Sequence, residues 1–175
     1  MRRSFLLACL GWAIPARAQP GIAPGLLNYA GGALARLIED ARQQAIADGV
    51  RGIPPSVYRS LLGYFPAALL QRCRFAVGGS RALTLPALAF SYGDATAMTL
   101  GDVVLFKAET VARSDLKVWA HELTHVMQYQ RWGVDGFADR YVRDSRPVEQ
   151  EAIDNANRFV AWLPRRGLMP HPHQT

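Results

Sequence analysis

Cysteine is scarce in this sequence, which contains only Cys9 and Cys73 among its 175 residues. Cys9 lies in an N-terminal segment that is expected to be removed, so Cys73 would remain alone and an intramolecular disulfide is excluded. In the apolar context LLQRCRFAV, this cysteine is expected to be a small core residue. The chain is long enough to form one compact domain around such a core.

Long apolar runs, internal repeats and low-complexity segments are also missing from the sequence. No window is apolar for long enough to cross a membrane as a helix. The 20 basic residues are dispersed and form no stripe with interleaved aromatic residues, which argues against a nucleic-acid-binding surface. Half of the residues are hydrophobic and 19% are charged, as in an ordinary globular protein.

The first 18 residues have the organisation of a secretory signal peptide. Two arginines at 2–3 precede an apolar run at 5–14, and the small-x-small triplet ARA follows at 16–18. We expect cleavage after Ala18 and export to the periplasm or the cell exterior, by either the general secretory or the twin-arginine route. Loss of three arginines leaves 17 basic and 14 acidic residues, a net charge of 17 − 14 = +3.

The rest of the chain is expected to divide into a flexible leader at 19–32, a single domain at 33–164 and a loose tail at 165–175. The domain opens with a predicted helix that begins at Ala33 and ends near Gly49. Apolar residues in this helix recur at spacings of three and four, and we expect them to share one buried face: Leu34, Leu37, Ile38, Ala41 and Ala45.

Short elements are predicted in the middle of the domain. Two helical segments and one strand come first: 56–62, 65–70 and 72–77, in that order. The segment 82–92 has a mixed pattern, and Pro86 argues against a central strand there. TAMT at 96–99 and VVLFK at 103–107 flank a turn and predict a hairpin.

The remainder of the domain is predicted to be helical, over 114–131, 135–143 and 147–162, with Ser114 as the N-cap of the first of these helices. The first helix can pack inward through Val118, Trp119, Leu123 and Val126. The last is expected to bury Val148, Ala152, Ala156, Phe159, Val160 and Leu163. Strands in the middle and helices at both ends indicate an α+β domain.

The segment HELTH at 121–125 carries the strongest chemical signal. On a helix, His121 and His125 share one face with Cβ atoms about 5–6 Å apart, so both imidazoles can reach one metal ion. Glu122 lies one step around the helix, where its carboxylate can act on a water molecule at that ion. H-E-x-x-H therefore predicts two zinc ligands and a general base. The alternative, a core helix with two hydrogen-bonded histidines, leaves the burial of these polar groups uncompensated.

A catalytic zinc site usually has three protein ligands, so a third must come from elsewhere. The candidates are Glu149 and Glu151, which are two positions apart on a helix and point in different directions. Glu149 is favoured because it shares a side with Val148 and Ala152. Glu151 is then expected to be solvated or to support a ligand. The two histidines of the 165–175 tail are set aside because the prolines around them indicate loose chain.

These motifs resemble known metalloproteins. HELTH followed about 25 residues later by an E-x-x-A helix is similar to the gluzincin zinc metallopeptidases. Together with TLGDVVLF at 99–106 and VEQEA at 148–152, it resembles more closely a small bacterial domain of unknown function. That domain is known as the core domain of extracellular contractile injection systems, and the resemblance covers about residues 60–162.

The resemblance implies a minigluzincin-like α+β fold with a small sheet packed on the HELTH helix and a C-terminal ligand helix. It implies that His121, His125 and Glu149 bind zinc and that Glu122 is the base. Many relatives carry an aspartate where this chain has Ile153, and the next residue, Asp154, is a candidate to replace it next to a ligand.

In gluzincins the substrate pairs with an edge strand beside the active-site helix, and either 96–99 or 103–107 is a candidate for that strand. The alternative is a plain core hairpin. An electrophile that stabilises the oxyanion is also expected. By chain position its candidates are Tyr129, Tyr141 and Arg143.

The motif thus predicts an exported zinc-dependent hydrolase, and the resemblance implies that it is a metallopeptidase with a peptide or protein substrate. Zinc would polarise the scissile carbonyl and a water molecule, and Glu122 would carry the water proton to the leaving nitrogen. A non-catalytic zinc-stabilised binding module and a cell-wall amidase are the alternatives. The sequence does not fix the oligomeric state.

Overall fold

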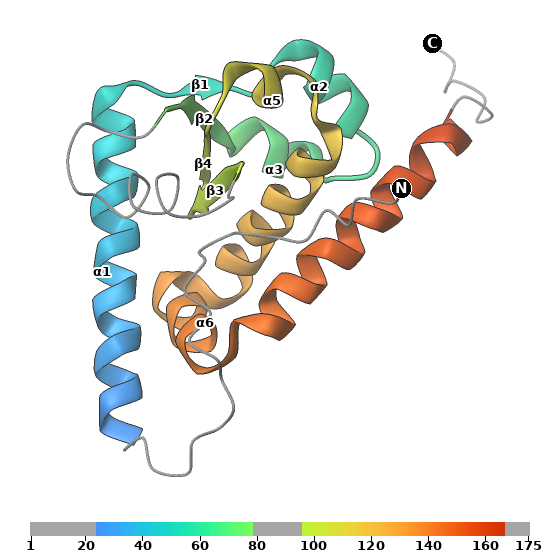
Figure 1. The fold of residues 1–175 in the computed structure, drawn as a ribbon. Helices are drawn as coiled ribbons and strands as arrows, with labels where there is room; N and C mark the ends of the chain where they lie inside the picture. The colour runs from blue at the N-terminus through green and yellow to red at the C-terminus, as the bar shows by residue number, and fades with distance from the viewer. Residues whose placement is uncertain (1–23, 79–95, 167–175) are drawn as a thin grey trace, which may run out of the picture.

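The computed structural model describes residues 24–78 and 96–166 (Figure 1). The predicted signal peptide at 1–18, the segment 82–92 and residues 167–175 of the predicted tail lie outside these ranges. Within them, the helices lack the combination of length and apolar character that crossing a membrane requires.

A small mixed sheet lies at the centre of the fold and confirms the α+β class. Its order is β1-β2-β4-β3. β1 (Arg51–Gly52) pairs antiparallel with β2 (Arg74–Val77), which pairs parallel with β4 (Val103–Phe106). β3 (Ala97–Leu100) then pairs antiparallel with β4. The sheet is flanked by helices on both sides (Figure 1), so the strands β3 and β4 are buried along their whole length.

The predicted hairpin is confirmed as β3 and β4. Leu100 pairs with Val103 across a two-residue turn in which Gly101 has φ 65°, a left-handed conformation that glycine adopts without strain. Arg42 reaches this turn from the first helix, and its Nε lies 2.8 Å from Asp102 Oδ1. The hairpin tip is therefore tied to the N-terminal helix.

The N-terminal helix α1 (Pro24–Asp48) begins nine residues before the predicted start at Ala33. Residues 24–32, predicted as flexible leader, are therefore helical up to the domain boundary, and that part of the prediction is wrong. The added turns contact the middle part of the long segment α6 (Leu116–Arg166): Asn28 accepts a hydrogen bond from Arg143, and a Cβ at Gly31 would lie 3.2 Å from Asp139 Cα. Tertiary contacts of this kind have no signature in the local sequence.

The buried face of α1 differs from the prediction at three positions: Ala35 is buried although it was not predicted, Leu34 is only partly buried, and Leu37 is exposed. Ala35, Ile38, Ala41 and Ala45 are buried, whereas Leu37 is 50% exposed. Successive residues of a helix are about 100° apart, so Leu37 cannot share the sector of Ile38. The end of the helix is as predicted, because Gly49 follows Asp48 with φ 105°.

Within the described residues, two short helices lie between β1 and β2, and a third follows β4. The two predicted ones are confirmed as α2 (Pro55–Leu61) and α3 (Ala67–Arg72). The third, α5 (Glu109–Ser114), was not predicted, and Ser114 is its last residue. Ser114 is therefore not an N-cap. Asp115 takes that role, because its Oδ1 accepts hydrogen bonds from the backbone N–H groups of Lys117 and Val118 at 3.1 and 3.0 Å.

The long C-terminal segment α6 (Leu116–Arg166) is three helices joined at two breaks. The backbone leaves the helical region at Gly133 (φ 70°, ψ 174°) and at Asp144 (φ −163°, ψ 102°). These breaks lie between the three predicted helices and confirm them. After Asp144 the chain turns back, so that the last helix runs alongside the first (Figure 1).

Two hydrophobic clusters cover the two faces of the hairpin. Val104 and Phe106 belong to one cluster with Trp119, Leu123 and Phe159. The alternate hairpin residues belong to the other, which α1 closes: Met98, Leu100, Val103 and Leu105.

Cys73 is fully buried in the first cluster, as predicted, and this burial raises the pKa of its thiol to about 12. Val160, predicted to be buried, is 42% exposed, whereas Ala156 and Phe159 on the same helix are buried as predicted.

Candidate metal centre

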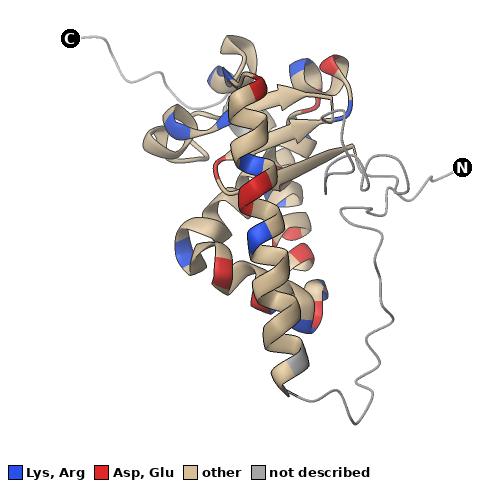
Figure 2. Cartoon of the chain, turned by 90° about the vertical axis from the view of Figure 1, so that its left-hand side faces the viewer, with Lys and Arg blue, Asp and Glu red and all other residues tan. Residues whose placement is uncertain are grey.

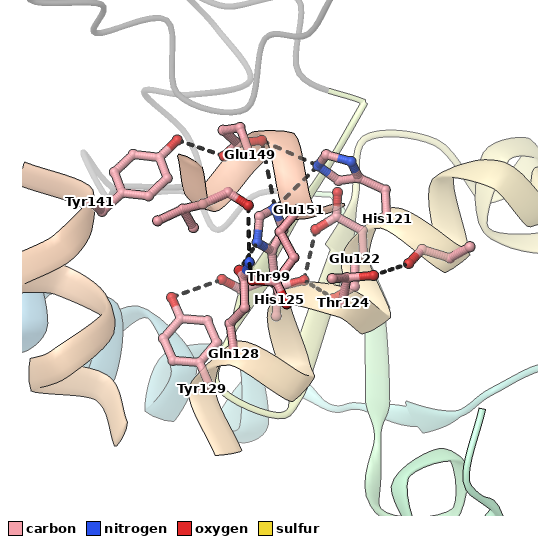
Figure 3. A network of polar contacts seen from close by, with 12 residues as sticks. Thr99, His121, Glu122, Thr124, His125, Gln128, Tyr129, Tyr141, Glu149 and Glu151 are labelled. Atoms are coloured by element: carbon pink, nitrogen blue, oxygen red, sulfur yellow. Dashed lines mark hydrogen bonds and ion pairs between the residues drawn. The ribbon is translucent and has the colours of Figure 1, made fainter. Parts of the chain in front are cut away.

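The first helix of α6 holds its polar face rigidly because its apolar face is buried. Trp119 and Leu123 are fully buried, Val126 is 1% exposed, and Trp119 Nε1 donates a hydrogen bond to the carbonyl of Ala112 at 2.8 Å. The HELTH segment therefore has little freedom to rotate. His121 and His125 project from one side of it toward the last helix of α6 (Figure 3).

Three donor atoms meet between these helices. His121 Nε2 and His125 Nε2 are 3.1 Å apart, and Glu149 Oε2 lies 3.4 Å from the first and 3.7 Å from the second. Four ligands placed tetrahedrally at zinc distances lie about 3.3–3.5 Å from one another. The three atoms are therefore spaced as ligands of a single zinc-sized ion. They form a group that could hold a metal ion.

Glu149 shows most directly that the group suits a cation. Tyr141 donates a hydrogen bond to Glu149 Oε1 at 2.9 Å. Within the described part of the chain, Glu149 Oε2 is buried and has no hydrogen-bond partner. A buried carboxylate oxygen in this condition is costly unless a positive charge compensates it. A cation between Oε2 and the two imidazoles supplies that compensation.

The charge states of the donors follow from their proximity. Burial lowers the pKa of His125, but the Glu149 carboxylate, and then Glu122, raise it to a net value of about 9. Burial favours the protonated form of Glu149, but His121 and His125 outweigh burial and lower the pKa of the carboxyl below its ordinary range. Proton and metal therefore compete for the same nitrogen of His125.

Glu122 lies beside the three donors and is 1% exposed. Thr99 of β3 donates a hydrogen bond to Glu122 Oε2 at 2.7 Å. The hydroxyl also lies 3.1 Å from the backbone carbonyl of Glu122. Thr99 therefore fixes the carboxylate beside the histidines (Figure 3). The sequence prediction missed this contact, because Thr99 comes from a strand 23 residues earlier in the chain.

The last helix of α6 separates the two candidate glutamates as its geometry requires. Glu149 faces the histidines, whereas Glu151 Oε2 accepts a hydrogen bond from Gln128 at 3.0 Å and Oε1 pairs with Arg131 at 3.1 Å. Asp154, the candidate to replace the aspartate missing at position 153, is exposed and accepts a hydrogen bond from Gln150. It contributes nothing to the donor group.

The three oxyanion candidates lie in different surroundings. Tyr141 reaches the centre through Glu149. Tyr129 is buried and donates a hydrogen bond to the carbonyl of Thr99 at 3.3 Å. Arg143 is exposed and donates to Asp139 at 2.8 Å. Of the three, Tyr141 is the residue placed in contact with a candidate ligand.

A cavity of about 30 Å³ adjoins the centre, which is room for one or two water molecules. It lies between α1, β3 and α6, and Glu122, His125, Glu149 and Tyr141 reach it. Its remaining lining is mostly apolar: Leu34, Ile38, Met98, Thr99, Leu100, Tyr129 and Phe137.

The two candidate substrate strands are distinguished by the sheet order. β4 lies between β2 and β3, so it has a partner on each side. β3 lies at the edge of the sheet that the described residues form, and it is the strand that contacts Glu122. TAMT, and not VVLFK, therefore has the position of an edge strand beside the HELTH helix.

Comparison with known proteins gives a family match. Residues 76–133 match the family model of the eCIS core domain, the domain of extracellular contractile injection systems that the sequence resembles. The match confirms that resemblance; it includes His121, Glu122 and His125 and ends before Glu149. No curated protein and no solved structure matches the chain.

Proposed function

We propose that this chain, whose HELTH segment matches the eCIS core domain, is a zinc-dependent hydrolase of the metallopeptidase type. The observation that carries the proposal is the buried Glu149 Oε2, which faces the two imidazole Nε2 atoms at 3.4 and 3.7 Å. Two nitrogens and one carboxylate oxygen are a donor set typical of catalytic zinc. We therefore assign His121, His125 and Glu149 as the ligands.

When bound, zinc would supply Lewis acidity that polarises the scissile carbonyl and acidifies water. Glu122 takes a proton from the attacking water molecule and transfers it to the leaving nitrogen. Thr99 holds the carboxylate of Glu122 in place for this transfer, and Tyr141 orients Glu149 through its Oε1. A positioned base of this kind contributes about 10²–10⁴ in rate.

A peptide substrate is supported by the position of β3. Main-chain pairing with an edge strand binds extended peptides and tolerates many side chains. β3 lies next to Glu122, so a peptide laid along it would pass the centre. The hydroxyl of Tyr129 already bonds the carbonyl of Thr99, so a bound peptide would have to share or displace that contact.

The substitution Glu122→Gln tests this function. The amide keeps the shape of the side chain but cannot take the proton, so the variant should retain about one zinc per chain and lose about 10²–10⁴ in rate. His121→Ala should lose zinc and activity together. Zinc content is measured by elemental analysis, and the rate on a peptide identified from a proteome-derived library with a chelated control. Cleavage by Glu122→Gln at the wild-type rate would refute the mechanism.

A non-catalytic zinc-stabilised module is the second candidate, and one observation favours it. Glu122 and His125 are only 1% and 4% exposed, so little of the centre meets solvent. If this candidate is correct, zinc raises the melting temperature while no peptide in the library is cleaved. The same library experiment therefore decides between the two functions.

We also propose that the protein is exported, on the basis of the N-terminal RR, the apolar run and the ARA triplet. The product should begin at Gln19 and be found outside the cytoplasm. N-terminal sequencing of protein purified from its native cell checks this. A cytoplasmic product that begins at Met1 would exclude export.

A further inference from the structure

Gln128 is a buried polar residue next to the metal centre that the proposed mechanism does not use. Its side chain is fully buried, one helical turn after His125. Its Oε1 lies 2.8 Å from His125 Nδ1. Its Nε2 donates to the carbonyl of Val148 at 2.9 Å and to Glu151 Oε2 at 3.0 Å. The side chain therefore connects a candidate ligand to the helix that carries Glu149 (Figure 3).

These contacts fix which way the amide of Gln128 points. The carbonyl of Val148 and the carboxylate of Glu151 are both acceptors, so they require the NH₂ group on their side. The amide oxygen then faces His125, and it can only accept a hydrogen bond. His125 Nδ1 must therefore carry a proton, and the lone pair available to a metal is on Nε2, the atom that faces His121 and Glu149.

We infer that Gln128, held by Glu151, is a positioning residue that sets the ring orientation and tautomer of His125. The inference rests on the proposed metal site. It also assigns Glu151: this glutamate anchors the amide of Gln128 and is itself paired with Arg131 at 3.1 Å. Groups that hold the second nitrogen of a histidine ligand in this way tune both its orientation and its basicity.

The carboxylate is a better anchor for this amide than a neutral group would be. Hydrogen bonds to a charged acceptor are roughly twice as strong as neutral ones. Glu151 is part-exposed, with 35% of its side chain accessible, so its charge remains partly hydrated while it holds the buried amide. The aspartate missing at position 153 is thus not required to orient His125, because Gln128 performs that role.

Five variants, one of them Gln128→Glu alone, and a control test the inference. Gln128→Leu removes both functions of the amide. Glu151→Ala removes its anchor, and the double variant Gln128→Leu/Glu151→Ala measures whether the two act as one unit. In Gln128→Glu/Glu151→Gln the acceptor for His125 and a bond between the two side chains are both kept, whereas the bond to the carbonyl of Val148 is lost, as it also is in Gln128→Glu alone. Gln150→Leu, an exposed position on the same helix, is the control.

Zinc affinity is measured by competition with a chelator. Gln128→Leu should weaken it by about 10–100-fold, and Glu151→Ala by less than about tenfold. Glu151→Ala should add nothing in the Gln128→Leu background, because its effect passes through the amide. The exchanged pair Gln128→Glu/Glu151→Gln should bind zinc more tightly than Gln128→Glu alone, and Gln150→Leu should bind as wild type does.

A second readout separates this inference from the proposed function. In chelator-treated protein, the proton on His125 Nδ1 should exchange slowly with solvent, as seen in ¹H–¹⁵N spectra of the imidazole. It should exchange fast in Gln128→Leu. If wild type binds no zinc, the metal site fails, whereas a slow Nδ1 proton that depends on Gln128 still supports positioning. If Gln128→Leu leaves both the zinc affinity and the exchange rate of the His125 Nδ1 proton unchanged, the positioning role of Gln128 is wrong.

If Glu151→Ala weakens zinc binding equally in both backgrounds, Glu151 acts directly on the metal and the assignment is wrong. Thermal unfolding in excess chelator checks that each variant is folded. A Gln128→Leu protein that fails to fold leaves the exchanged pair as the decisive variant. Failure of that pair to regain zinc affinity relative to Gln128→Glu alone, which sets two carboxylates against each other, would also refute the inference.

Discussion

His125 is the residue on which proton, metal and neighbouring carboxylates act together. Burial lowers its pKa, but Glu149 and Glu122 raise it to about 9. The ordinary value in an unfolded chain is 6.5. In protein from which a chelator has removed metal, the protonated imidazole therefore stabilises the fold fully below pH 6.5. That contribution is lost as the pH rises through about 9.

The melting temperature of chelator-treated protein should therefore fall between pH 6.5 and pH 9. His125→Gln should flatten this part of the profile, because the amide does not titrate. With zinc the dependence reverses in sign, since the metal needs an unprotonated Nε2 and its stabilising effect should grow as the pH rises toward 9. Differential scanning calorimetry across this range is the measurement. If the melting temperature of chelator-treated wild type does not change between pH 6.5 and about 9, the raised pKa of His125 is wrong.

For single residues, the sequence predicts those parts of the site that lie within one turn of the same helix. His121, Glu122 and His125 are recognisable because their chemistry depends on spacing along a single helix. Thr99 was not predicted because it acts on Glu122 from another element. Gln128 was not predicted because its amide is oriented by Val148 and Glu151, which lie on another helix. Glu149 and Glu151 could be separated because residues two positions apart on a helix point in different directions. Glu149 was favoured because it shares a side with Val148 and Ala152.

The breaks within α6 are the element-level feature that makes the centre possible. A continuous helix after His125 would carry Glu149 about 36 Å away, at 1.5 Å per residue. Gly133 and Asp144 interrupt the helix so that its last part returns to its first. Gly133 has φ 70° and ψ 174°, a region that is essentially restricted to glycine.

Gly133→Ala should therefore destabilise the protein by about 1–3 kcal/mol. A Cβ at this position would meet no described atom within 4 Å, so the loss reports backbone strain and not a clash. Gly32→Ala is the control of opposite sign. It lies in helix α1, is exposed and is equally open, and should stabilise by about 0.5–1 kcal/mol. Urea unfolding measures the free energy of unfolding of both variants. Equal effects of the two substitutions would show that Gly133 is not required by its backbone conformation.

Helices and turns could be predicted where residues within or next to the element determine where it ends. Gly49, Gly101 and Gly133 mark ends and turns that the structure contains. The unpredicted helix α5 has six residues, too few to display an apolar period. The early start of α1 depends on contacts with Asp139 and Arg143, more than a hundred residues away in sequence.

At the scale of the whole molecule, the centre lies where the two hydrophobic clusters meet. Trp119 and Leu123 of the HELTH helix belong to one cluster, whereas Tyr129 of the same helix belongs to the other. α1 completes the second cluster and contributes Leu34 and Ile38 to the cavity beside Glu122. Access to the centre is thus determined partly by a helix that carries none of its ligands.

Charged residues are interspersed along the face of the molecule that α1 dominates (Figure 2). Arg42 lies between two acidic groups, with Glu39 at 3.3 Å and Asp102 at 2.8 Å. On this face positive and negative side chains alternate, as on an ordinary solvated surface. The docking of α1 combines small apolar contacts with the ion pair between Arg42 and Asp102.

The return of α6 upon itself also has a consequence for chain entropy. Glu149 meets His125 across 24 residues (149 − 125), whereas Gly31 of α1 meets Asp139 across 108 (139 − 31). Closure entropy grows with the logarithm of loop length, so the longer loop costs about 1.3 kcal/mol more to close. The three donor atoms are therefore brought together by the shorter closure. Helix α1, whose docking closes the longer loop, needs correspondingly more stabilisation from its side-chain contacts.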